Sequence, residues 1–319
     1  IDLLRCHAAN LPPDRTRLTT PRRVDERALV GNLFSDTTQV VPAATGRYKA
    51  TIDARWNLLP LPQGGIVTAL ALRAMTAELG DPTQRLRTSH TTFAARVADG
   101  PVEIDVDLLR RGRSMSQLRA EVRNVGADRG HVTTAVFGAD RPGFEFTDQP
   151  LPADLPPPTA CPSFRDPLPE GVDPFEPLPF WSHVEGRPAL GHPWWERYEP
   201  GRAERAGWYR FDEPPMAADG SMDPLALVVL SDFMPGALGE KVGGTGRPQR
   251  EWFAPSVDLS VHLLGDCRSE WVLAHNTARH AGDGYASADM ALWDCGADGA
   301  ATPRLVAHAT QVFFFTFLG

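Results

Sequence analysis

The apolar residues of this chain predict the same order of secondary-structure elements twice. In the first half, an alternating strand at Tyr48–Ile52 precedes an alanine- and leucine-rich helix at Ile66–Leu79. In the second half, a strand at Trp208–Phe211 precedes a helix at Leu225–Met234. Strand-like runs follow both helices: Thr88–Val97, Val102–Arg110, Ser116–Asn124 and His131–Phe137, then Ser256–Leu263, Glu270–Arg279, Tyr285–Asp294 and Leu305–Phe317. This repeat predicts two equivalent α+β units, each with a helix and an antiparallel sheet.

The helix of the second half carries one residue that needs a specific explanation. Between Pro224 and Pro235, every residue is apolar or small except Ser231 and Asp232. A helix that is apolar nearly all round is buried, and an unpaired carboxylate in a protein interior costs several kcal/mol. Asp232 therefore either reaches solvent or a local cap at the helix end, or it has dedicated partners. The first helix has Arg73 at the equivalent place, so helix packing does not require an acid there.

Four regions are expected along the 319 residues. Residues 1–29 form an N-terminal extension, residues 30–140 the first repeat and residues 206–319 the second. Between the repeats, residues 141–205 hold 15 of the 30 prolines and show no periodicity, which predicts a connector without regular structure. Aromatic side chains indicate that the connector packs against a surface: Phe175, Phe180, Trp181, Trp194, Trp195 and Tyr198.

Composition excludes several classes of protein. The net charge of −8 disfavours non-specific nucleic-acid binding. The four cysteines are far apart in the sequence and form no CxxC motif, so they predict neither a disulfide framework nor a zinc site. No apolar run reaches the roughly 18 residues of a membrane span, and the first residues do not fit a signal peptide. We therefore expect a cytoplasmic protein.

Short motifs occur in a definite order in both halves. The first half contains Gly64-Gly65, Ser89-His90-Thr91-Thr92-Phe93, Leu109-Arg110-Arg111-Gly112-Arg113-Ser114 and Val136-Phe137-Gly138. The second contains Leu230-Ser231-Asp232, Ser256-Val257-Asp258-Leu259-Ser260 and Ala309-Thr310-Gln311. With these motifs, residues 30–140 and 206–317 resemble the TesB-like acyl-CoA thioesterase II family. The resemblance implies a double hotdog fold, in which two tandem repeats each wrap an antiparallel sheet around a long central helix.

The resemblance also implies a catalytic set. In that family, an Asp on the helix, a Thr or Ser on the next strand and a Gln on the last strand hold the attacking water, and these positions correspond to Asp232, Ser256 and Gln311. A thioester carbonyl is already electrophilic, so its hydrolysis needs an oriented water rather than a protein nucleophile. Asp232 would be the general base, with its pKa raised by burial. Ser256, where relatives have Thr, and Gln311 would orient the water or the carboxylate.

The first half lacks this set. Arg73, Thr88 and Ala135 occupy the places that correspond to Asp232, Ser256 and Gln311 when the two halves are aligned. The first half therefore has neither the base nor the amide, and we expect one active site per chain.

Four residues are expected to bind substrate. Gly64 and Gly65 precede the first helix, and Arg110 and Arg113 could meet the phosphates of coenzyme A. The expected partner is an acyl-CoA or an acyl-carrier thioester, with no metal, no organic cofactor and no nucleic acid. The resemblance further implies a homo-oligomer.

Two alternatives remain open. The same fold could carry a dehydratase or another enzyme that processes carrier-bound acyl groups in a polyketide-like pathway. Asp258 and His262 share a face of one strand, but the Asp–His pair of a hotdog hydratase lies in a loop-and-helix setting that this stretch lacks. The fold could also serve as a non-catalytic acyl-binding protein. The long connector leaves both alternatives open, because it could cover or reshape the site.

Overall fold

The computed structural model describes residues 32–58, 60–172, 178–193, 195–245, 252–296, 299 and 301–317. The N-terminal extension expected at residues 1–29 lies outside the described residues, as do Phe175 and Trp194 of the connector.

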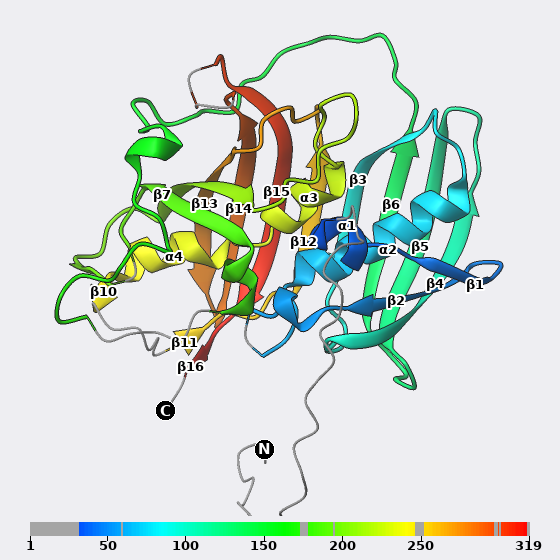
Figure 1. The fold of residues 1–319 in the computed structure, drawn as a ribbon, viewed down its shortest axis with the longest axis horizontal. Coiled ribbons are helices and arrows are strands. Elements are labelled where there is room, and N and C mark those ends of the chain that lie inside the picture. The colour runs from blue at the N-terminus through cyan, green and yellow to red at the C-terminus, as the bar shows by residue number, and fades with distance from the viewer. Residues whose placement is uncertain are drawn as a thin grey trace, which may run out of the picture. The chain divides into compact units, whose positions relative to one another are not determined.

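The described part of the chain is built on one antiparallel sheet of 12 strands (Figure 1). Its order is β1-β2-β4-β5-β6-β3-β12-β15-β14-β13-β9-β7. The strands of the first half are β1 (Val41–Ala44), β2 (Arg47–Ile52), β3 (Arg85–Thr92), β4 (Gly100–Arg110), β5 (Met115–Asn124) and β6 (His131–Gly138). Those of the second are β7 (Val184–Leu190), β9 (Glu204–Phe211), β12 (Asp258–Leu263), β13 (Val272–Gly282), β14 (Tyr285–Asp294) and β15 (Arg304–Phe314).

The sheet consists of two equivalent halves that meet at its centre. Counted outward from the centre, the order β3-β6-β5-β4-β2 in one half corresponds to β12-β15-β14-β13-β9 in the other. The halves join where β3 pairs antiparallel with β12, with Thr91 opposite Leu259. The repeat of a strand, a helix and an antiparallel meander, predicted from the sequence, is confirmed.

The helices of the two halves differ in length. Helix α2 (Gly64–Leu79) has 16 residues, whereas α3 (Pro224–Leu230) has seven and is followed by a separate helix, α4 (Pro235–Val242). The expected helix at Leu225–Met234, and with it a second long central helix, is therefore wrong. Pro235 has no N–H to donate to the carbonyl of Ser231, and its ring would clash with that carbonyl, so the helix ends a turn earlier and restarts at Pro235.

Helices α2 and α3 pack against each other and form the centre of the core. Alternate residues of β5, among them Leu118, Ala120 and Val122, are buried on the face that α2 covers. The two helices approach so closely that a Cβ added to Gly65 would lie 2.8 Å from Cα of Val229. Because backbone atoms cannot move aside as a flexible side chain can, this contact requires glycine.

The proline-rich connector contains regular structure that its composition did not predict. Strand β7 forms the edge of the large sheet and pairs with β9, and residues 141–205 also include two short 3-10 helices, η2 (Pro158–Ala160) and η3 (Pro179–Ser182). Pro188 lies within β7, and an edge strand tolerates proline because one side of it needs no partner. The expectation that the connector packs against a surface is met by Phe180, which is fully buried.

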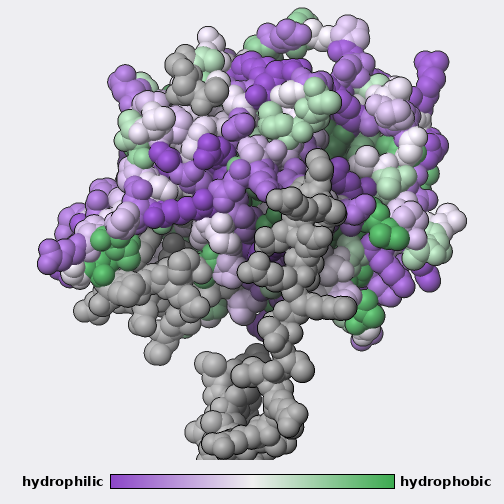
Figure 2. Space-filling view, in the orientation of Figure 1, coloured by the Kyte–Doolittle hydropathy of each residue, from purple (hydrophilic) through white to green (hydrophobic). Residues whose placement is uncertain are grey.

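The remaining elements are short. They are helix α1 (Leu33–Thr37), the 3-10 helix η1 (Ala54–Trp56) and two small two-stranded sheets, β8 (Arg197–Tyr198) with β10 (Gly244–Thr245) and β11 (Trp252–Phe253) with β16 (Thr316–Phe317). The face in Figure 2 is mainly hydrophilic, with hydrophobic residues in separate small groups. Among the described residues, every helix is too short or too polar to cross a bilayer.

Candidate active site

Asp232 follows α3 directly, where the chain turns toward α4. Its side chain is buried, with 9% of the residue exposed. Oδ2 accepts a hydrogen bond of 3.0 Å from the N–H of Gly65, and Oδ1 accepts one of 2.5 Å from Nε2 of Gln311. The carboxylate therefore has specific partners from distant parts of the chain, and the local-cap explanation of Asp232 does not apply.

The start of α2 lies against this carboxylate. The first N–H groups of a helix have no partner within the helix and carry partial positive charge, so they favour a carboxylate. A Cβ added to Gly64 would lie 3.0 Å from Oδ2 of Asp232 and 2.7 Å from the ring of Phe93. Both expected glycines thus lie at the site, and their small size allows the helix start to reach Asp232.

Ser256 and Gln311 come from adjacent strand segments of the second half. Ser256 precedes β12 and forms an isolated bridge with Phe313 of β15, the strand that also carries Gln311. Nε2 of Gln311 donates to Oγ of Ser256 over 2.9 Å as well as to Asp232. The structure therefore brings together Asp232, Ser256 and Gln311, which lie far apart in the sequence.

Burial sets the ionisation of Asp232. Desolvation raises its pKa from the ordinary 3.8 to about 6, because a buried carboxyl group loses the water that stabilises its charge. Hydrogen bonds from Gln311, from the backbone at Gly65 and Gly64 and from Ser256 oppose this rise. The outcome is a carboxylate that is ionised at neutral pH but remains basic enough to accept a proton.

The orientation of the Gln311 amide follows from its partners. An ionised carboxylate only accepts hydrogen bonds, so the amide nitrogen must face Asp232. Oε1 of Gln311 then points elsewhere, and it is buried without a hydrogen-bond partner among the described residues. A buried carbonyl oxygen in this state is an acceptor for a small polar group.

Sequence reasoning missed Gln63. Its Oε1 accepts from the N–H of Ile66 and so caps α2, and its Nε2 donates to the carbonyl of Val229 over 2.6 Å. Gln63 is 2% exposed and links the start of α2 to the end of α3. A polar residue directly before Gly64-Gly65 at a helix start was the available signal.

Arg110 and Arg113 are not at this site. They lie in the turn between β4 and β5, and the intervening Arg111 donates to the carbonyl of Leu79 at the C-terminal end of α2. Gly64 begins that helix, so the turn lies about 22 Å away along α2 at 1.5 Å per residue. Their expected contact with the phosphates of coenzyme A stays a prediction.

The corresponding place in the first half is closed by an ion pair. Arg73 contacts the carboxylate of Asp223, the residue that caps α3, and also donates to Thr38. The register does not allow both sequence alignments, Thr88 with Ser256 and Ala135 with Gln311, to hold at once, because Thr92 pairs with Val132 whereas Ser260 pairs with Thr310.

Asp258 and His262 do not form an acid–base pair. Asp258 accepts from the N–H of Val312, whereas Nδ1 of His262 contacts the hydroxyl of Thr88 over 2.9 Å. The acid–base arrangement of a dehydratase is thus not formed by these two residues.

Comparisons with known proteins match both halves of the chain. The family model of the acyl-CoA thioesterase C-terminal domain matches residues 154–315, and that of the N-terminal domain matches residues 52–138. No curated protein matches the sequence.

Similar solved structures show the fold. A hot dog protein of unknown function from Alicyclobacillus acidocaldarius has a TM-score of 0.71 and 23% identity, covering 91% of this chain and 100% of its own. The acyl-CoA thioesterase II TesB2 of Mycobacterium marinum has a TM-score of 0.66 and 17% identity, covering 90% and 99%. The tesB protein of Mycobacterium avium subsp. paratuberculosis has a TM-score of 0.64 and 18% identity, covering 89% and 98%. The described sheet is thus a tandem hotdog.

Proposed function

Because the chain belongs to the acyl-CoA thioesterase family and is therefore a thioester hydrolase, we propose that it cleaves acyl-CoA with a water activated by Asp232. One observation carries this proposal. A buried carboxylate with a pKa of about 6 shares the amide of Gln311 with the hydroxyl of Ser256. A general base is most effective when its pKa lies near the working pH.

We propose that the attacking water lies where the site offers unpaired hydrogen-bond acceptors. Gly65 and Gln311 donate to the two oxygens of Asp232, and Gly64 and Ser256 also hydrogen-bond this carboxylate. Oε1 of Gln311 is buried and has no hydrogen-bond partner among the described residues. A water between these atoms would donate one hydrogen to Asp232 and the other to Gln311, so its lone pair would point at the thioester carbonyl.

The reaction then proceeds without a covalent enzyme intermediate. Asp232 takes a proton from the water while the water oxygen attacks the carbonyl carbon. The carbon–sulfur bond breaks, the thiolate of coenzyme A leaves, and the proton held by Asp232 returns to the leaving group. The N–H of Gly65 holds the carboxylate throughout and is thus not free to bind the oxyanion.

We also propose that the working unit is the second repeat, at residues 206–319, completed by the helix start of the first repeat at residues 30–140. Three of the polar groups come from the second repeat, and the N–H of Gly65 comes from the first. This arrangement gives one active site per chain, since Arg73 and Asp223 fill the corresponding place.

The proposal is tested by thiol release from a panel of acyl-CoAs. Asp232→Asn removes the base with little change in shape, and we expect it to lower kcat/KM at least about a hundredfold. Asp223→Asn is the matched control, because it neutralises an acid at the other end of the same helix and keeps the capping oxygen. Equal activity of Asp232→Asn and Asp223→Asn would refute the assignment of Asp232. A wild-type protein that binds acyl-CoA but releases no thiol would favour the acyl-binding alternative.

A further inference from the structure

The residue after the proposed base is part of an aromatic stack. The ring of Phe233 lies 5.2 Å from that of Trp181 and 5.2 Å from that of Tyr209, nearly parallel to both. Tyr209, on β9, is buried, whereas Phe233 and Trp181 keep part of their surface accessible. A partly accessible apolar surface therefore includes the residue that follows Asp232 in the chain.

Trp181 reaches this position because the connector contacts both segments that carry the site. The N–H of Phe180 donates to the carbonyl of Asn57, in the loop that leads into Gly64, over 3.1 Å. The ring of Phe180 lies 5.8 Å from that of Trp56 and 5.3 Å from that of Phe233. Helix η3 thus spans from the entry of α2 to the end of α3.

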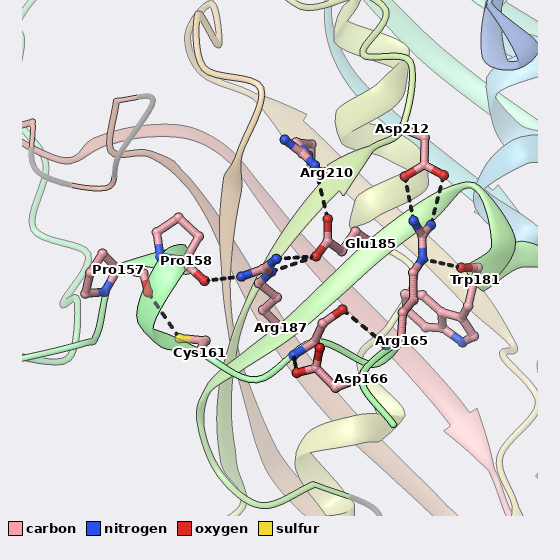
Figure 3. Close-up of polar contacts among 11 residues, drawn as sticks. Pro157, Pro158, Cys161, Arg165, Asp166, Trp181, Glu185, Arg187, Arg210 and Asp212 are labelled. Atoms are coloured by element: carbon pink, nitrogen blue, oxygen red, sulfur yellow. Dashed lines mark hydrogen bonds and ion pairs between the residues drawn. The ribbon is translucent and has the colours of Figure 1, made fainter. Parts of the chain in front are cut away.

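Charged groups hold η3 in place (Figure 3). The guanidinium of Arg165 binds both carboxylate oxygens of Asp212, at 2.8 and 3.0 Å, and its Nε donates to the carbonyl of Trp181. A bidentate ion pair fixes the orientation of the guanidinium as well as its distance from the carboxylate. The ring of Phe164 adds an edge contact to Trp181 at 5.3 Å. The Trp181 ring is therefore held firmly rather than resting loosely on the surface.

We infer that Trp181, together with Phe233, forms the end wall of the acyl-binding space and limits the length of the acyl chain. The inference rests on the proposed function, which places the thioester carbonyl at Asp232. The acyl chain must leave that carbonyl along an apolar surface, and the Phe233–Trp181 pair is such a surface, carried by the residue that follows the base. The rings of Tyr209 and Phe180 are buried behind it and fill the space that a longer chain would need. Interiors packed at this density do not yield to extra methylenes without strain.

The test compares acyl chain lengths in wild type and Trp181→Leu, a variant that keeps an apolar side chain but shortens the wall. With acyl-CoAs of about four to about sixteen carbons, we expect the variant to gain kcat/KM for longer chains relative to shorter ones. Each additional buried methylene should contribute up to about fourfold to that ratio. Arg165→Ala, which releases the backbone of Trp181, should shift the preference in the same direction by a smaller factor.

A second tryptophan provides the control. Trp271 packs between Arg187 and Arg210 in a separate apolar cluster, so Trp271→Leu tests for a general loss of packing. It should lower thermal stability without changing the ratio of long-chain to short-chain kcat/KM. If Trp181→Leu leaves that ratio unchanged, or changes it no more than Trp271→Leu does, the proposal that Trp181 forms the end wall is refuted. Absence of wild-type activity on every acyl-CoA would instead refute the proposed function.

Discussion

The raised pKa of Asp232 predicts a defined response of activity to pH. The pKa lies at about 6 because the carboxyl group is buried, and only the ionised form can accept a proton from water. About one-tenth of the groups are ionised at pH 5 and about nine-tenths at pH 7, so kcat/KM should rise about tenfold over this interval and then level off. A solvent-exposed aspartate would be ionised throughout, and the rate would not change.

The same shift predicts a cost in stability. Below pH 3.8, Asp232 is protonated in both the folded and the unfolded chain, so it does not favour unfolding. Between 3.8 and 6 the unfolded chain releases the proton while the folded protein retains it, and the free energy of unfolding falls as pH rises. Above 6 the loss is complete, at about 3 kcal/mol from the difference in pKa.

Asp232→Asn isolates this contribution. The variant cannot ionise at residue 232, so the difference in free energy of unfolding between wild type and variant should change by about 2.4 kcal/mol from pH 4 to pH 7. Urea unfolding at several pH values measures it. Burial lowers the pKa of His131 and of His183 to about 4, so both residues destabilise the folded protein as pH falls. This effect is equal in wild type and variant and cancels in the difference.

Two results would refute this reasoning. A wild-type rate that is the same at pH 5 and pH 7, with substrate saturation checked at each pH, would show that the ionisation of Asp232 does not limit catalysis. A stability difference that stays constant with pH would show that the carboxyl group is not desolvated. Asp223→Asn serves as the control, since its partner Arg73 is retained and Asp232 is untouched.

Further predictions concern the groups around Asp232. Ser256→Ala should lower kcat by about tenfold or more, whereas Ser256→Thr keeps the hydroxyl and should stay within about threefold of wild type in the same thiol-release assay. Gly65→Ala places a Cβ 2.8 Å from Val229, so the free energy of unfolding should fall by about 1–3 kcal/mol in urea; an unchanged value would contradict the close approach of α2 and α3. Asp223→Asn should cost about 1 kcal/mol through loss of the Arg73 ion pair, and Asp223→Ala about 1 kcal/mol more through loss of the helix cap, with thiol release unchanged.

Much of the fold could be predicted because its signals are local and repeated. Alternation in strands such as β5 and the alanine- and leucine-rich pattern of α2 are set by which face is buried, and both are visible in the sequence. The grouping of Asp232, Ser256 and Gln311 was predicted by resemblance. What supports it physically is that Asp232 and Gln311 are buried polar residues, and such residues need partners.

The errors arose where a distant contact decides the outcome. Apolar residues continue through Met234, but the backbone requirement of Pro235 ended α3 at Leu230. Strand β7 was hidden by its proline-rich surroundings, because its pairing with β9 depends on partners outside the segment.

The ion pair between Arg73 and Asp223 bears on how the two helices are aligned. Helices α2 and α3 run antiparallel, with Gly65 meeting Asp232 at one end and Arg73 meeting Asp223 at the other. A slide of one helix along the other by a single residue, about 1.5 Å, would break both contacts together. The ion pair thus adds to the packing that holds the two helices in register.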